Sequence, residues 1–144
     1  MPTSPVPTAL QLPWNQRQVF TNSDGLSLKT LALGGFYSAQ TTPSKVFAIY
    51  VSSSDSIAHD FQLGVTDPTL GFIPIGTVSI PPSSGLTSGA IGINLLQKLT
   101  HLAQDNAGQP YIFLNPTDVL QGKMGIAAVG GANSILVTTV GADF

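Results

Sequence analysis

The residues that could carry chemistry in this chain are few, and most of them gather in one polar stretch. Ser56, His59 and Asp60 supply the hydroxyl, imidazole and carboxylate of a nucleophile system. Such a system places the imidazole against the hydroxyl with the carboxylate behind it, a geometry normally assembled from separate segments. Here all three lie in one stretch that lacks a Gly-x-Ser-x-Gly elbow. A turn-forming polar loop explains them better, so no catalytic residue is predicted.

Metal ligation has two candidate groups. Asp55, His59 and Asp60 carry carboxylate and imidazole ligands within six residues. His101 and Asp105 are spaced i, i+4, which suits either a surface pair or two ligands on a helix. Neither group reaches four ligands, so we predict no metal site and no cofactor.

Composition excludes several classes of function. The chain has five Lys and Arg, seven Asp, no Glu and no Cys, for a net charge of −2. The absence of a basic cluster argues against nucleic-acid binding through phosphates. Without Cys there is no disulfide framework and no thiolate metal site. No apolar run approaches the ~20 residues that span a bilayer, so the predicted partners include neither nucleic acid nor a membrane.

The low charge also bears on fold and assembly. Charged residues make up 8 % of the 144 residues, against ~25 % in ordinary soluble domains. Scarce Glu and Lys, which fill helix surfaces, favour a β-rich chain. The neutral surface that remains suits coverage by neighbouring subunits. A solitary, hydroxyl-rich β domain is the alternative.

The elements that must position these residues are short strands. Apolar and alternating runs predict a central strand at Val46–Val51, a strand with one wet face at 61–66, and a strand at 72–80. Pro74 lacks an N–H donor, so the last of these lies at an edge or is bulged there. Ile93 to Leu102 has near-helical spacing and is predicted as the single helix. Three strands joined by turns at 115–118 and 130–133 predict an antiparallel carboxyl-terminal meander between 109 and 140.

The amino-terminal segment is predicted to be an extended, Pro-rich arm over residues 1–20, followed by a single β-sandwich domain over 21–144. Trp14, the only Trp, either folds back on its own domain or anchors in a neighbouring subunit, where Trp is a favoured hot spot. Leu86 stands in the longest loop signal and is exposed unless a partner covers it. The predicted partner-binding residues are Trp14, Arg17, Phe20 and Leu86.

The carboxyl-terminal third resembles a known class of proteins. The run Gly108 to Leu120, with its Asn-Pro-Thr-Asp turn, and the ending Gly141-Ala142-Asp143-Phe144 resemble small virion proteins of tailed bacteriophages that coat or cement the head. The resemblance covers about Val46 to Phe144. It implies an all-β, jelly-roll-like antiparallel β-sandwich that oligomerises, often as a homotrimer, on the major capsid protein at the outer capsid surface. It carries over no catalytic residues.

The sequence therefore predicts a non-catalytic structural virion protein that self-associates and stabilises the capsid, with its amino-terminal arm bound to a neighbouring subunit. The alternatives are a head–tail connector or tail-associated β-sandwich protein, a carbohydrate-binding module, and a hydrolase that uses His59 or His101. The aromatic faces open to a sugar are Trp14, Tyr37, Tyr50 and Tyr111.

Overall fold

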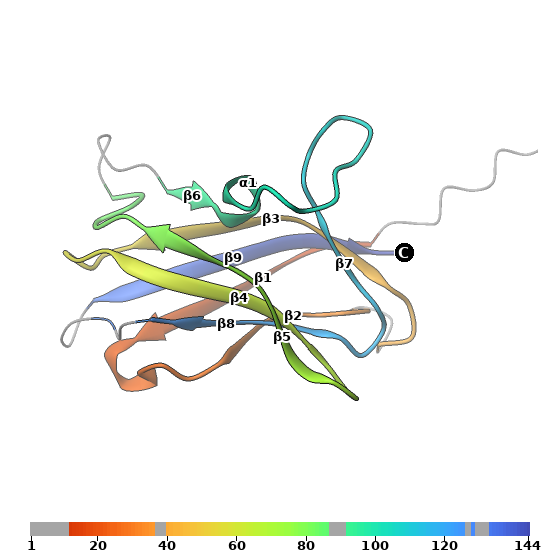
Figure 1. The fold of residues 1–144 in the computed structure, drawn as a ribbon, viewed down its shortest axis with the longest axis horizontal. Helices are drawn as coiled ribbons and strands as arrows, with labels where there is room; N and C mark the ends of the chain where they lie inside the picture. The colour runs from red at the N-terminus through yellow and green to blue at the C-terminus, as the bar shows by residue number, and fades with distance from the viewer. Residues whose placement is uncertain (1–11, 37–39, 87–91, 126–127, 129–132) are drawn as a thin grey trace, which may run out of the picture.

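The computed structural model describes residues 12–36, 40–86, 92–125, 128 and 133–144. They form two antiparallel sheets that pack face to face (Figure 1). Sheet A has the strand order β1 (Leu12–Thr21), β9 (Ser134–Asp143), β3 (Ser44–Ser53) and β6 (Ile93–Asn94), and β7 (Ile112–Leu114) also pairs with β3. Sheet B has the order β2 (Lys29–Leu33), β8 (Val119–Met124), β4 (His59–Asp67) and β5 (Gly71–Ile80).

The strand order is that of a jelly roll. Consecutive strands lie in different sheets except for β4 with β5 and β6 with β7, so the described chain crosses between the sheets six times. As a result the first and last strands lie side by side in sheet A, while β2 and β8 lie side by side in sheet B. Pairing of strands from opposite ends of the chain is the Greek-key connection from which double-sheet jelly rolls are built. The predicted all-β sandwich is confirmed.

The core lies between the two sheets, because alternate side chains of each strand point inward. Phe61 and Leu63 of sheet B are fully buried, and Phe20 of sheet A meets the Phe61 ring edge-on with the ring centres 5.3 Å apart. The wet-face alternation predicted for the strand at 61–66 is confirmed for residues 61–63, whereas Gly64 on the expected wet face is buried against Phe72. The inner face of the central strand β3 is buried, whereas its outer face is partly covered and Tyr50 there is exposed.

The predicted arm over residues 1–20 is corrected by β1. Leu12–Thr21 pairs along its full length with β9, so the domain begins by residue 12 rather than residue 21. Residues 1–11 lie outside the described residues, as do Tyr37, the loop positions 87–91 and the turn positions 130–132. Trp14 and Phe20 of β1 are buried in the core, and their burial offsets the cost of ordering the strand.

The helix predicted from Ile93 to Leu102 is much shorter. The α-helix α1 covers only Leu95–Lys98, and it is preceded by β6. The Asn94 side chain accepts a hydrogen bond from Leu96 N–H and so caps the helix, while Leu99 returns to an extended conformation. Both α1 and β6 lie beside β3 (Figure 1). None of the helices in the described part of the chain has the length and apolar character that crossing a bilayer needs.

The predicted carboxyl-terminal meander is also corrected. β7 pairs with β3, β8 with β2 and β4, and β9 with β1 and β3, so none of the three pairs with another of the three. The turn between the first two is confirmed, with Asp118 N–H bonded to Asn115 O at 3.0 Å. For Pro74 both readings hold, because β5 is the edge of sheet B and its register with β4 shifts at this point.

Candidate functional site

Trp14 is held inside its own domain. Its side chain is 4 % exposed, and Nε1 donates to the buried Asp143 Oδ1 at 2.9 Å. Ser44 Oγ and the Phe36 backbone N–H donate to the same oxygen at 2.6 and 3.2 Å. Of the two readings of this Trp, folding back on the domain is the one found. Trp14 is therefore not available to a partner, and its prediction as a binding residue is corrected.

Phe20 is likewise part of the core. It is 1 % exposed, and Lys29 Nζ lies 5.4 Å from the centre of its ring. Lys29 also donates to Val19 O at 2.5 Å, which ties the β1 edge of sheet A to β2 of sheet B. The prediction that Phe20 binds a partner is corrected for the same reason: the ring has no exposed surface.

Arg17 and Leu86 are exposed, and the structure brings them to one face. Arg17 is in register with Thr138 of β9, and Thr138 is in register with Tyr50 of β3. The three therefore form one row across the outer face of sheet A. The next row contains Val19, Leu136 and Ser52. Gly85 packs so closely against Ser52 that an added Cβ would lie 3.0 Å from the Ser52 Cβ, so the loop that carries Leu86 passes beside the end of this row.

The result is an exposed apolar surface, here called the outer-face patch and defined as Val19, Tyr50, Leu86 and Leu136. Their side chains are 40, 54, 60 and 37 % exposed. Single exposed apolar residues are ordinary, whereas a group of them on one face is a candidate interaction surface. Arg17 and Thr138 supply polar groups beside it. Tyr and Arg are the residue types enriched at protein–protein interfaces.

Sequence reasoning did not assign Val19, Tyr50 or Leu136 to a partner surface. Tyr50 and Leu136 lie in strands that were predicted, but both faces of those strands carry apolar residues, and Val19 lies in the segment predicted as an arm. The period of two then cannot say which face is buried. The signal that would have helped is the cross-strand register, which appears only when β1, β9 and β3 are seen side by side.

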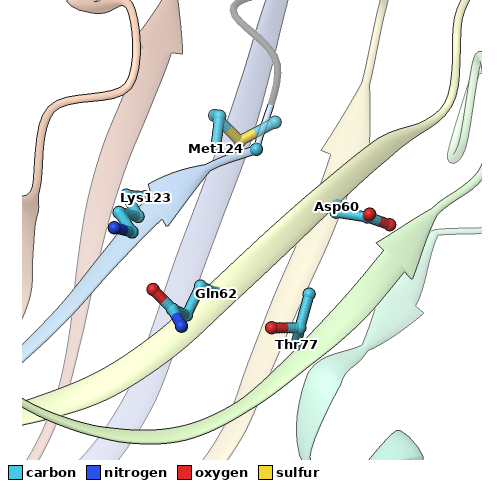
Figure 2. Close-up of a pocket in the computed structure, with 6 residues that line it drawn as sticks. Asp60, Gln62, Thr77, Lys123 and Met124 are labelled. Atoms are coloured by element: carbon cyan, nitrogen blue, oxygen red, sulfur yellow. The ribbon is translucent and has the colours of Figure 1, made fainter.

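The outer face of sheet B carries a different, polar surface. Lys123, Gln62 and Thr77 occupy one cross-strand row on β8, β4 and β5, as Figure 2 shows. With Asp60, Met124 and Gly125 they line an open hollow of about 250 Å³. Hydroxyl, amide and charged groups of this kind suit hydrogen bonding to a polar ligand. Of the aromatic residues considered for sugar stacking, none lines this hollow within the described part of the chain.

The candidate nucleophile system is not assembled. His59 Nε2 and Asp55 Oδ2 lie 2.8 Å apart, and both side chains are fully buried. Ser56 and Asp60 are exposed instead. A hydroxyl nucleophile must contact the imidazole to lose its proton, and an enclosed His–Asp pair has no access to substrate. The pair joins the β3–β4 connection to the start of β4, and the Ser83 N–H donates to the Asp55 backbone carbonyl at 2.8 Å.

The metal candidates do not converge either. His101 is exposed and lies beyond α1, so it and Asp105 do not share a helix face. Asp105 Oδ1 accepts from the backbone N–H groups of Ala107 and Gln109, both at 2.9 Å. Across the described ranges there is no group of three or more side chains placed to hold a metal ion.

Comparisons with known proteins found no match: no protein-family model matches the sequence, and no curated protein does.

Proposed function

We propose that this chain is a non-catalytic structural protein of a bacteriophage virion, which self-associates and binds the outer surface of the capsid. In this role it stabilises the shell, as a decoration or cement protein does. The favoured assembly is a homotrimer on the major capsid protein. The proposal combines the resemblance of the carboxyl-terminal third with the exposed surface of sheet A.

The observation that carries the proposal is the outer-face patch. Val19, Tyr50 and Leu136 lie on one sheet face with the loop of Leu86 beside them, and the whole chain has only twelve charged residues. Burial of such a patch against another subunit is favourable at about 25 cal/mol per Å² of apolar area. Contacts of ~800 Å² per partner become secure when a symmetric lattice repeats them.

The fold supports the proposal without deciding it. Jelly rolls form viral capsid domains, but they also form lectins. Because one fold hosts many functions, the exposed surface of sheet A, and not the fold, carries the proposal. The long edge strands β1 and β5 add a second means of contact, since unpaired strand edges can pair with another chain.

The first test is self-association of the purified chain, measured by sedimentation equilibrium. A variant with Tyr50→Ser and Leu136→Ser should dissociate at least tenfold more readily. Leu70→Ser is the matched control, because Leu70 is an exposed apolar residue outside the patch. A wild-type chain that stays monomeric at every concentration, or a patch variant that associates as tightly as wild type, contradicts the proposal.

The second test is the number of copies in purified virions that carry this chain. A decoration protein is present in hundreds of copies, whereas the alternative head–tail connector or tail-associated β-sandwich is present in few. Quantitative mass spectrometry of the particles separates the two.

A carbohydrate-binding module is the second candidate, and the hollow on sheet B favours it. Asp60, Gln62, Thr77 and Lys123 present hydrogen-bonding groups around one open depression (Figure 2). A glycan array should then show binding that Gln62→Ala and Thr77→Ala abolish. Binding that these variants leave unchanged removes the hollow as the site.

A further inference from the structure

Sheet A has a second exposed surface, which surrounds Lys45. The Lys45 ammonium lies 4.4 Å from the centre of the Tyr111 ring and 5.3 Å from that of Phe47. Phe113 of β7 is the register partner of Lys45 and is 52 % exposed. Directly opposed residues have Cβ atoms ~4.5–5.5 Å apart. The three rings and the ammonium therefore form one surface, here called the aromatic platform.

An aromatic platform suits a particular class of ligand. Pro-rich segments dock on surfaces lined by aromatic rings, because a polyproline II backbone is already extended and loses little entropy on binding. Cation–π contacts of the kind that Lys45 makes hold the rings in place.

The chain contains such a segment. Residues 1–11 precede β1, include Pro2, Pro5 and Pro7, and carry no charged side chain. Their point of attachment lies in the same row as the platform: Pro13 is in register with Ala142, Ala142 with Lys45, and Lys45 with Phe113. The attachment point and Phe113 are three strand spacings apart, or ~14 Å at ~4.8 Å per spacing.

The direction in which β1 enters the sheet argues for a second copy as the acceptor. A residue before proline is held extended, and Leu12, which precedes Pro13, is in register with Asp143 at the end of β9. β1 therefore begins at the end of sheet A, and residue 11 joins it there. If Pro2 to Pro7 lay on the platform of the same chain, residues 8–11 alone would have to turn the chain and span the ~14 Å to Phe113. A platform on another copy does not impose this limit.

We propose that the Pro-rich segment of one copy, residues 2–7, docks on the aromatic platform of a second copy, formed by Lys45, Phe47, Tyr111 and Phe113. This inference rests on the proposed self-association and names one contact that makes it. It predicts a head-to-tail interface, in which each copy donates one segment and accepts another. Such an interface closes into a ring when the rotation between copies permits.

The test uses disulfide trapping in the full chain, which has no Cys of its own. One variant carries Pro5→Cys and the other carries Gln109→Cys, an exposed position two residues before Tyr111. Mixing the two under mild oxidation should give a covalent dimer. Replacing Gln109→Cys by Leu70→Cys, an exposed position outside the platform, should give no dimer above background.

Further measurements separate the outcomes. In sedimentation, Phe113→Ser and the triple change Pro2→Ala, Pro5→Ala and Pro7→Ala should each weaken self-association about tenfold, and mixing the two variants should restore part of it. If a chain with both Cys substitutions closes on itself as a monomer, the segment occupies its own platform and the proposal is overturned. If the wild-type chain self-associates but Pro5→Cys and Gln109→Cys form no covalent dimer, the docking proposal is overturned and the proposed function is unaffected. A wild-type chain that is always monomeric removes both.

Discussion

Trp14 Nε1 donates a hydrogen bond to Asp143 Oδ1 at 2.9 Å, and the two residues stand 129 positions apart in the sequence. The bond joins β1, the first strand, to β9, the last. The same oxygen accepts from Ser44 Oγ on β3, so three strands are fastened at one end of sheet A. Gly141 makes room for the indole, because a Cβ at this position would lie 2.7 Å from the Trp14 ring.

Asp143→Ala is expected to destabilise the fold by about 3 kcal/mol or more, because buried donors left without an acceptor each cost ~1–3 kcal/mol. Asp143→Asn keeps an acceptor oxygen and should cost less. Urea unfolding measures the difference. Asp60→Ala is the control: that carboxylate is exposed, and such changes usually stay within about 0.5 kcal/mol. Equal stability of Asp143→Ala and wild type would show that the hydrogen bonds to the Asp143 carboxylate do not stabilise the fold.

Gly122→Ala is expected to cost about 1–3 kcal/mol through overpacking. A Cβ at position 122 would overlap the Phe61 ring, which in turn packs edge-on against Phe20. Removing ring atoms with Phe61→Leu should make room, so the two changes together should cost less than the sum of each alone. A double-mutant cycle by thermal unfolding measures this coupling, which is expected to be on the order of 1 kcal/mol. Additive effects would contradict the predicted overlap.

Local signals in the sequence were enough for much of the fold. Pro74 indicated an edge or a bulge, and β5 shows both. Asn115 to Asp118 indicated a turn, which forms with Asn115 N–H donating to Asp118 Oδ2 at 2.9 Å. In each case one residue type has a geometric consequence within a few positions, because proline lacks a donor and a short carboxylate can bond nearby backbone.

Structural features that depend on tertiary pairing could not be predicted from the sequence. The apolar spacing from Ile93 to Leu102 is close to helical, yet Ile93 pairs with Val51 of β3 and only Leu95–Lys98 is helix. Turn residues mark where strands end but not which sheet the next strand joins, so the meander was wrong. Among the predicted partner-binding residues, Arg17 and Leu86 are exposed, whereas Trp14 and Phe20 are buried in the core. The pairing of β1 with β9 determines that Trp14 and Phe20 face the core and Arg17 faces outward.

The turn between β1 and β2 should make stability depend on acid. The pKa of Asp24 is lowered from its usual 3.8, first by the hydrogen bond from Thr21 N–H and then by that from Lys29, while desolvation acts in the opposite direction. Because the folded-state pKa lies below the unfolded one, this stabilisation is present above about pH 3.8 and is lost as the pH falls through the folded value. Asp24→Asn should therefore lower the urea midpoint at pH 7 and have little effect near pH 2. A deficit of the same size at both pH values would exclude the carboxylate charge as its cause.

The buried pair of Asp55 and His59 separates a structural role from the hydrolase reading. His59 Nε2 and Asp55 Oδ2 lie 2.8 Å apart, and both side chains are fully buried. Removing one side chain therefore leaves the other buried without this contact. Breaking a buried pair in this way costs about 3–5 kcal/mol, whereas replacing both members by apolar groups of similar volume is often close to neutral. We therefore expect Asp55→Ala to lower the unfolding free energy by about 3 kcal/mol, and Asp55→Val combined with His59→Leu to recover part of that loss. Calorimetric unfolding of wild type and the two variants measures these differences in unfolding free energy.

A catalytic histidine would behave differently. His59→Leu would then abolish a hydrolytic activity of the wild-type chain, even in the double variant that has regained stability. Recovery of stability with no such activity in any of the chains assigns the pair to the fold, whereas an activity lost with His59 would overturn the non-catalytic role proposed here.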